Sequence, residues 1–162
     1  MKTKKNSIFI ITLFFIISSC AGYEPIFGSK NLSFKISSYT IEGDKKLGNK
    51  IYSKLNDISK NSKNNENSRL IDVKINILQN KIATSKNSSG KILEYTVTLA
   101  STISIKDALT DEILVYESSN TSTKYKIEDQ YSETINSERT AIENLLNSMY
   151  QKLLINLSQN II

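Results

Sequence analysis

Apolar and polar residues alternate over four long stretches of the chain, and two further stretches repeat their apolar residues with a helical period. Alternation with a period of two places successive side chains on opposite faces of a strand. In the longest alternating stretch the odd positions are mostly Leu, Val and Ile, while the even positions are mostly Thr and Ser. This pattern predicts strands at residues 32–41, 70–77, 92–106 and 113–124.

The first predicted strand changes phase at Ser37 and Ser38, which indicates a β-bulge. Asp44 can then cap a helix, because its side chain can accept a hydrogen bond from a free N–H group of the first turn. The apolar residues of that helix follow at spacings of four, four and three: Leu47, Ile51, Leu55 and Ile58.

A second and longer helix is predicted at residues 132–158. Arg139 interrupts its apolar stripe, and we expect this side chain to extend to the solvent at the rim of the stripe. The stripe is wide and apolar over most of its length: Ile135, Ile142, Leu145, Leu146, Met149, Tyr150, Leu153, Leu154 and Leu157.

The predicted order of elements is β-α-β-β-β-α, with turns near residues 87–90 and 107–111 and a polar loop at 61–68. Strands joined by short turns must be antiparallel, and such a sheet can bury one face while the other remains wet. We therefore expect an α+β fold, a two-layer sandwich with two helices on one face of a four-stranded, mainly antiparallel sheet. The wet face would carry Lys74, Asn76, Thr96, Thr98, Thr102 and Ser104.

The first twenty residues have the pattern of a bacterial lipoprotein signal. Three lysines in the first five residues precede an apolar run at 8–17, and Ile17-Ser18-Ser19-Cys20 fits a lipobox. The alternative is an ordinary signal peptide with a coincidental cysteine. The expected organisation is a cleaved signal at 1–19, a lipidated Cys20 with a tether at 20–31, one domain at 32–158 and a tail at 159–162.

The apolar run is too short for a transmembrane helix, because ten helical residues reach about 15 Å and a hydrocarbon core needs roughly 20 residues. A thioether to diacylglycerol at Cys20 and a further acyl chain on its amine would anchor the protein firmly, since each buried CH₂ contributes ~0.8 kcal/mol. Ala21 stands where an aspartate would resemble an inner-membrane retention signal. We therefore expect the outer membrane, with no disulfide because Cys20 is the only cysteine.

The basic composition does not indicate a nucleic-acid partner. The formal charge of +5 falls to +2 when the three signal lysines are removed. The remaining 143 of the 162 residues allow one domain with a modest core.

The chain lacks the residue types that most catalytic sites use. It has no histidine and no tryptophan, and its only cysteine is the predicted lipidation site, so we expect neither a metal site nor a cofactor. The acidic pairs at 111–112 and 128–129 are interpreted as solvated loop charges. A serine–lysine hydrolase is a formal alternative, but no spacing singles out such a pair, and we expect the protein not to be an enzyme.

Two regions resemble the LptE family of lipopolysaccharide-assembly lipoproteins. Residues 22–28 read Gly-Tyr-Glu-Pro-Ile-Phe-Gly, similar to the family's Cys-Gly-aromatic-x-Pro-apolar-aromatic-Gly start, although Ala21 is inserted after Cys20. The stretch Tyr-Thr-Val-Thr-Leu at 95–99, the turn at Asp107, Tyr125 and the long final helix are also similar to the family.

The resemblance implies a subunit of the outer-membrane lipopolysaccharide translocon, which sits as a plug in a β-barrel partner of the LptD type, helps it assemble and binds lipopolysaccharide. A Ser- and Thr-rich sheet face would suit the hydrated lumen of a wide barrel. Five basic residues are candidate contacts for the phosphates of lipopolysaccharide, with solvated surface charges as the alternative: Lys74, Lys106, Lys124, Lys126 and Arg139.

A second hypothesis is an accessory lipoprotein of an ABC-type intermembrane lipid transporter, since such proteins also combine an outer-membrane anchor with a small α/β domain. The stretch at 22–28 favours the translocon subunit.

Overall fold

The computed structural model describes residues 32–61 and 68–161. The predicted signal peptide, the lipidation site Cys20, the tether and most of the polar loop at 61–68 lie outside these ranges. They remain predictions.

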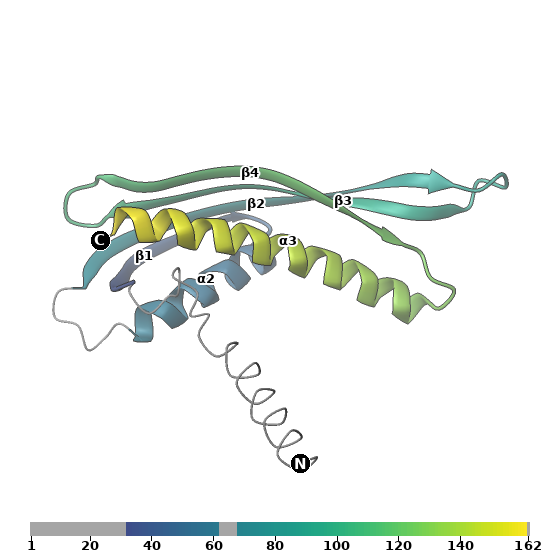
Figure 1. The fold of residues 1–162 in the computed structure, drawn as a ribbon. Coiled ribbons are helices and arrows are strands. Elements are labelled where there is room, and N and C mark those ends of the chain that lie inside the picture. The colour runs from purple at the N-terminus through teal and green to yellow at the C-terminus, as the bar shows by residue number, and fades with distance from the viewer. Residues whose placement is uncertain (1–31, 62–67, 162) are drawn as a thin grey trace, which may run out of the picture.

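The described residues form the predicted order of elements, β-α-β-β-β-α. The fold is an α+β sandwich in which both helices lie on one side of the sheet, as expected (Figure 1). In the labels of Figure 1 the elements are β1 (Phe34–Gly43), α2 (Lys45–Asn61), β2 (Arg69–Lys86), β3 (Ile92–Asp107), β4 (Ile113–Lys126) and α3 (Tyr131–Asn160).

The four strands are arranged in sequence order across the sheet. The β2–β3 and β3–β4 pairs are antiparallel, as strands joined by short turns must be. β1 pairs parallel to β2 because α2 returns the chain to the end of the sheet at which β1 began. The sheet is therefore mainly antiparallel, and β1 and β4 form its edges.

Two local features of the sequence lead to the predicted geometry. The register of β1 against β2 shifts between Ile36 and Ser38, where the phase of the alternation changes. The N–H of Leu47 donates a 3.0 Å hydrogen bond to Oδ1 of Asp44, so Asp44 caps α2 as expected.

Three elements are longer than their patterns predict. β2 continues to Lys86 instead of ending at Ile77, because its partner β3 extends the ladder from Leu78↔Ala100 to Lys86↔Ile92. β4 includes Tyr125, and α3 continues to Asn160 rather than ending before the predicted tail at 159. Pairing and packing with a neighbour thus maintain these segments where alternation has faded.

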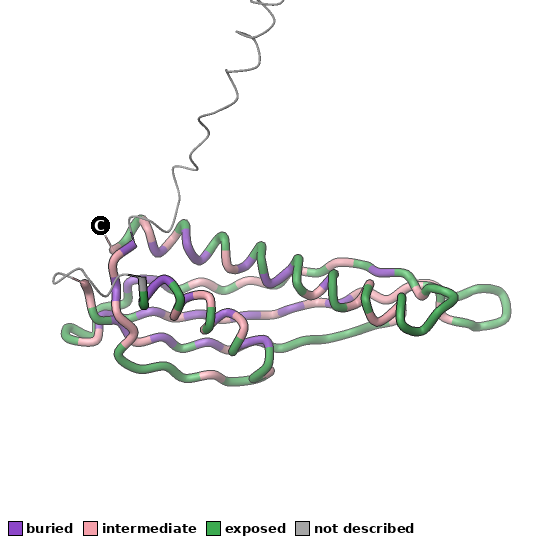
Figure 2. The backbone as a smooth tube through the Cα atoms, turned by 90° about the horizontal axis from the view of Figure 1, so that it is seen from below, coloured by how far each residue is buried: buried purple, intermediate pink, exposed green. Residues whose placement is uncertain are grey.

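The core lies between the sheet and the two helices. Its buried residues recur along both helices and along the strands (Figure 2). The predicted apolar stripe of α2 is fully included, and so is most of that of α3. From the strands the core takes alternate residues: Ile71, Val73, Ile75, Ile77, Val97, Leu99, Ile103 and Ile105. Complete burial of one such side chain contributes roughly 1.5–3 kcal/mol.

The helices differ in how much of the sheet they cover. α3 has 30 residues, about 45 Å of helix, and runs along most of the sheet, whereas the 17 residues of α2 make about 25 Å and cover only the part near β1 (Figure 1). The far part of the β2–β3 hairpin therefore extends past β1, and α3 is the only helix among the described elements that covers it (Figure 1).

A partly buried ion pair lies at the other end of the sheet. Nε of Arg69 lies 2.6 Å from Oδ2 of Asp107, which is only 6% exposed. Oδ1 of Asp107 also accepts hydrogen bonds from the N–H groups of Leu109 and Thr110. The hydrogen bond from Arg69, followed by those two backbone bonds, lowers the pKa of Asp107 to about 2.

Neither helix of the described ranges is long and apolar enough to cross a membrane.

Candidate functional site

The uncovered face of the sheet, on the side away from the helices, is lined by hydroxyl and amide groups. It is formed by the even-numbered residues of β2, β3 and β4, which alternate with the core residues. Thr98 of β3 lies opposite Ser122 of β4, and Thr102 lies opposite Ser118. The residues predicted for a wet face are all partly or fully exposed: Lys74, Asn76, Thr96, Thr98, Thr102 and Ser104.

A small apolar region interrupts this polar face. Leu78 is 57% exposed and lies opposite Ala100, while Ile82, 54% exposed, lies four residues further along β2, opposite Thr96. A shallow hollow of about 340 Å³ lies beside Leu78, lined also by Asn76, Ala100, Thr102 and Asn120. The face therefore combines hydrogen-bonding groups with a modest apolar patch, a composition that suits a wet protein–protein contact.

The five predicted basic contacts do not form one site. Lys74 and Lys106 lie on neighbouring strands at one end of the uncovered face, where Lys106 pairs in register with Asp72. Lys124 and Lys126 lie on β4 at the opposite end, across from Thr96 and Glu94. Arg139 belongs to α3, which covers the opposite side of the sheet.

Two of these basic residues already have a carboxylate partner. Nζ of Lys74 lies 2.8 Å from Glu42, and Nζ of Lys124 lies 3.1 Å from Glu94. The hydrogen bond from Lys124 is the main cause of a lowered pKa of Glu94. The positive charge of the uncovered face is thus partly neutralised by its own acidic residues.

The acidic pairs of the sequence are exposed, as predicted for loop charges: Asp111, Glu112, Glu128 and Asp129. Glu112 also lies 3.2 Å from Arg69, an ion pair that the sequence pattern did not predict.

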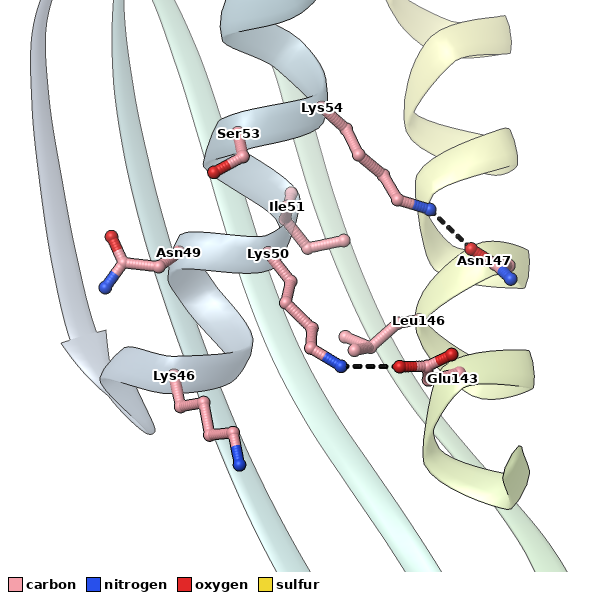
Figure 3. A pocket seen from close by; sticks show the side chains of 9 residues that line it. All are labelled: Lys46, Asn49, Lys50, Ile51, Ser53, Lys54, Glu143, Leu146 and Asn147. Carbon is pink, nitrogen blue, oxygen red and sulfur yellow. Dashed lines mark hydrogen bonds and ion pairs between the residues drawn. The ribbon is translucent and has the colours of Figure 1, made fainter. Parts of the chain in front are cut away.

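A groove between α2 and α3 is a second candidate site (Figure 3). Lys50 reaches across it to Glu143 at 2.7 Å, and Lys54 reaches across to Asn147 at 2.5 Å. The hydrogen bond from Lys50 lowers the pKa of Glu143. The sequence pattern did not predict this groove, although the spacing of Lys50 and Lys54 places both on one side of α2.

Lys81 forms a third cluster under the projecting hairpin. Its ammonium lies 2.8 Å from Glu138 and 4.6 Å from the centre of the Tyr95 ring, which stacks against Tyr125. Burial alone would lower the pKa of Lys81, but hydrogen bonds to Glu138 and Tyr125 raise it overall. These contacts join the start of α3 to the sheet, and we interpret them as structural.

Within residues 32–61 and 68–161, no three His, Cys, Asp or Glu side chains are grouped so that they could hold a metal ion.

Comparison with known proteins shows the fold but not a family. No family model and no curated protein matches the chain. A solved structure assigned as a lipoprotein from Caulobacter crescentus matches with a TM-score of 0.50 at 15% identity, over 76% of this chain and 88% of that one. The solution structure of an uncharacterized lipoprotein B from Nitrosomonas europaea has a TM-score of 0.50 at 17% identity, over 76% and 81%.

A protein from Xanthomonas campestris, described as DUF330, has a TM-score of 0.53 at 7% identity, over 84% of this chain and 91% of that one. At these identities the likeness is one of fold. The chain thus shares its sandwich with solved bacterial proteins, two of which are described as lipoproteins.

Proposed function

We propose that the chain is an outer-membrane lipoprotein anchored through Cys20, and that it acts as the plug and assembly subunit of a lipopolysaccharide translocon with a β-barrel partner. The role is one of binding, and involves no catalysis. The proposal combines the lipobox, the resemblance of residues 22–28 to the LptE family and a fold that is shared with described lipoproteins.

The uncovered sheet face is the observation that carries this proposal. The helices cover the other face, so the hydroxyl and amide groups at the even-numbered positions of β3 and β4 point away from the helix layer. The lumen of a wide β-barrel is polar and hydrated, and a face of Thr, Ser and Asn side chains can exchange hydrogen bonds with it directly or through water. A domain with two apolar faces would not fit such a lumen.

Site-specific photo-crosslinking tests which face meets the partner. A photoreactive residue at Thr98, in the middle of the uncovered face, should form an adduct with a large β-barrel protein in cells that make lipopolysaccharide. The same residue at Gln151, exposed on α3, is the matched control and should give much less adduct. An adduct at Gln151 with none at Thr98 would contradict the proposed orientation.

Purification of the tagged full chain in mild detergent tests the partner itself. The barrel protein should be recovered with it, whereas recovery of an ABC transporter would support the accessory-lipoprotein alternative. Recovery of the lipoprotein alone, under conditions that preserve barrels, would count against both.

The anchor and the pathway have separate tests. Cys20→Ser should abolish labelling of the protein with radioactive palmitate. Depletion should reduce lipopolysaccharide at the cell surface and admit hydrophobic antibiotics, and unchanged surface lipopolysaccharide after complete loss would overturn the translocon role.

A further inference from the structure

Large apolar side chains are exposed together at the end of the sheet where β1 begins. Leu109, Tyr116 and Ile113 are 81%, 66% and 58% exposed, and Leu70 is exposed beside them. Single apolar residues are common on protein surfaces, but a group of them marks a surface that contacts something else. We refer to these four residues as the apolar corner.

The four residues lie close together although they come from three segments. The N–H of Ala108 donates a 2.9 Å hydrogen bond to the backbone oxygen of Leu70, which places Leu109 beside the start of β2. Ile113 and Tyr116 lie on the first part of β4, opposite residues of β3 that belong to the uncovered face. The apolar corner therefore occupies one end of that face and the turn that adjoins it.

A hydrogen-bonded turn holds Leu109 in its exposed position. Oδ1 of Asp107 accepts hydrogen bonds of 2.8 and 3.0 Å from the N–H groups of Leu109 and Thr110. The N–H of Asp111 donates to the backbone oxygen of Asp107 at 3.0 Å. Turns usually carry Gly, Asn, Asp or Ser, as the turn at 87–90 does with Asn-Ser-Ser-Gly at the opposite end of the sheet. The turn geometry therefore does not explain the leucine.

The apolar corner lies at the end of the domain from which the chain leads to the predicted anchor. The N–H of Arg69 donates to the backbone oxygen of Ser33, so β1 begins at the same end as the 107–112 turn (Figure 1). Residues 20–31 can span at most about 40 Å. The tip of the β2–β3 hairpin lies roughly 60 Å away along the 18 residues of β2. An anchor at Cys20 therefore brings the apolar corner closer to a bilayer than the hairpin tip.

The charges around the apolar corner nearly cancel. Arg69 is paired with Asp107 and Glu112, while Lys106 and Asp111 are exposed. These two positive and three negative groups leave one negative charge, so an anionic lipid surface would not attract this end. Apolar and tyrosine side chains enter the headgroup region of a neutral surface favourably, since the gain comes from burial of apolar area.

We propose that the apolar corner contacts a zwitterionic phospholipid surface, with Leu109 and Ile113 in the headgroup region and Tyr116 at its edge. A tether alone leaves the domain free to rotate, whereas a tether and this second contact together fix its orientation on the membrane. The contact rests on the proposed anchor at Cys20. It does not depend on the barrel partner.

Tryptophan fluorescence in vesicles tests the contact. The chain has no tryptophan, so one introduced indole is a unique reporter. Leu109→Trp places it in the apolar corner, and Ser89→Trp places it at the exposed hairpin tip as the matched control. Each full chain, with its lipid, is reconstituted in phosphatidylcholine vesicles whose acyl chains carry a spin-label quencher near the headgroup. The indole of Leu109→Trp should be quenched about three-fold more than that of Ser89→Trp.

Two uncharged substitutions in the Leu109→Trp chain test the apolar character of the contact. Ile113→Ser and Leu78→Ser remove side chains of nearly equal exposure from the same face, but only Ile113 belongs to the apolar corner. Ile113→Ser should lower quenching about two-fold, because less apolar area enters the membrane, and Leu78→Ser should leave it unchanged. Circular dichroism melts establish that each variant is folded.

The outcomes separate the contact from the anchor. Equal quenching at both ends, equal effects of Ile113→Ser and Leu78→Ser, or quenching that requires phosphatidylglycerol in the vesicles would each overturn the contact. Labelling with radioactive palmitate reports the anchor independently. A labelled chain without quenching of the Leu109→Trp indole overturns only the contact, whereas a chain that is neither labelled nor bound to vesicles overturns the anchor and the contact together.

Discussion

Leu99 and Thr98 are neighbours in β3 and share one hydrogen-bonded ladder, yet they belong to opposite environments. Leu99 is completely buried beneath the helices, whereas Thr98 is partly exposed on the uncovered face. The two faces belong to the same sheet, but in the part of the chain that the structure describes only one of them packs against a layer of helices. The helix-covered face therefore carries the stability of the domain, while the uncovered face is free to present groups to a partner.

The largest loss of stability is expected from a substitution on the helix-covered face, and the matching substitution on the uncovered face should cost little. Leu99→Ala removes a buried side chain and should reduce the free energy of unfolding by about 2–5 kcal/mol. Thr98→Ala, its neighbour on the uncovered face, should change it by no more than about 0.5 kcal/mol. Urea unfolding monitored by circular dichroism measures both, and similar losses would show that the uncovered face is covered in the isolated protein.

Low pH should weaken the ion pair between Arg69 and Asp107 and so reduce the stability of the fold. The pKa of Asp107 in the folded protein is about 2, below its ordinary 3.8, so the ionised carboxylate stabilises the fold above about pH 4. That contribution should be lost as the pH falls from about 4 towards 2. Unfolding free energies between pH 5 and 2 should show a shallower decline for Asp107→Asn than for the unchanged chain, and equal slopes would contradict this.

A smaller loss of stability is expected when the N-terminal cap of α2 is removed. Asp44→Ala removes the side chain that caps α2 and should cost about 1 kcal/mol, because the N–H of Leu47 loses its acceptor. Asp44→Asn preserves an acceptor oxygen and should recover most of the loss. Thermal melts of the two variants measure the difference, and equal melting temperatures for them would argue against capping.

The smallest effect should come from the charges of the uncovered face. Lys124→Ala breaks the exposed pair with Glu94 and should change stability by about 0–1 kcal/mol, less at high salt. The pKa of Glu94 should return towards its ordinary value in this variant, which NMR titration can follow. A large loss of stability would mean that the uncovered face also supports the fold.

Much of the fold was predictable because its signals are local. The alternation along β3 separates core from surface residue by residue, and the phase change at Ser37 and Ser38 marks the bulge in β1. The extension of β2 to Lys86 was not predictable from its own pattern, since the ladder to β3 maintains that segment.

The candidate site was predicted only in part. The polar character of the uncovered face follows from the even positions of the strands, and its residues were identified correctly. The five basic residues proposed together from their charge lie in three separate places, because charge alone contains no information about position.

By itself the sequence determined the types of the elements, their order and the face of each that is buried, because period-two and helical patterns act within one segment. Only the tertiary structure decided that β1 lies parallel to β2, that Arg69 meets Asp107, and that Lys50 and Lys54 face Glu143 and Asn147. Those contacts join residues 38 and 93 positions apart in the chain. Their geometry depends on how the helices cross the sheet, which no local pattern encodes.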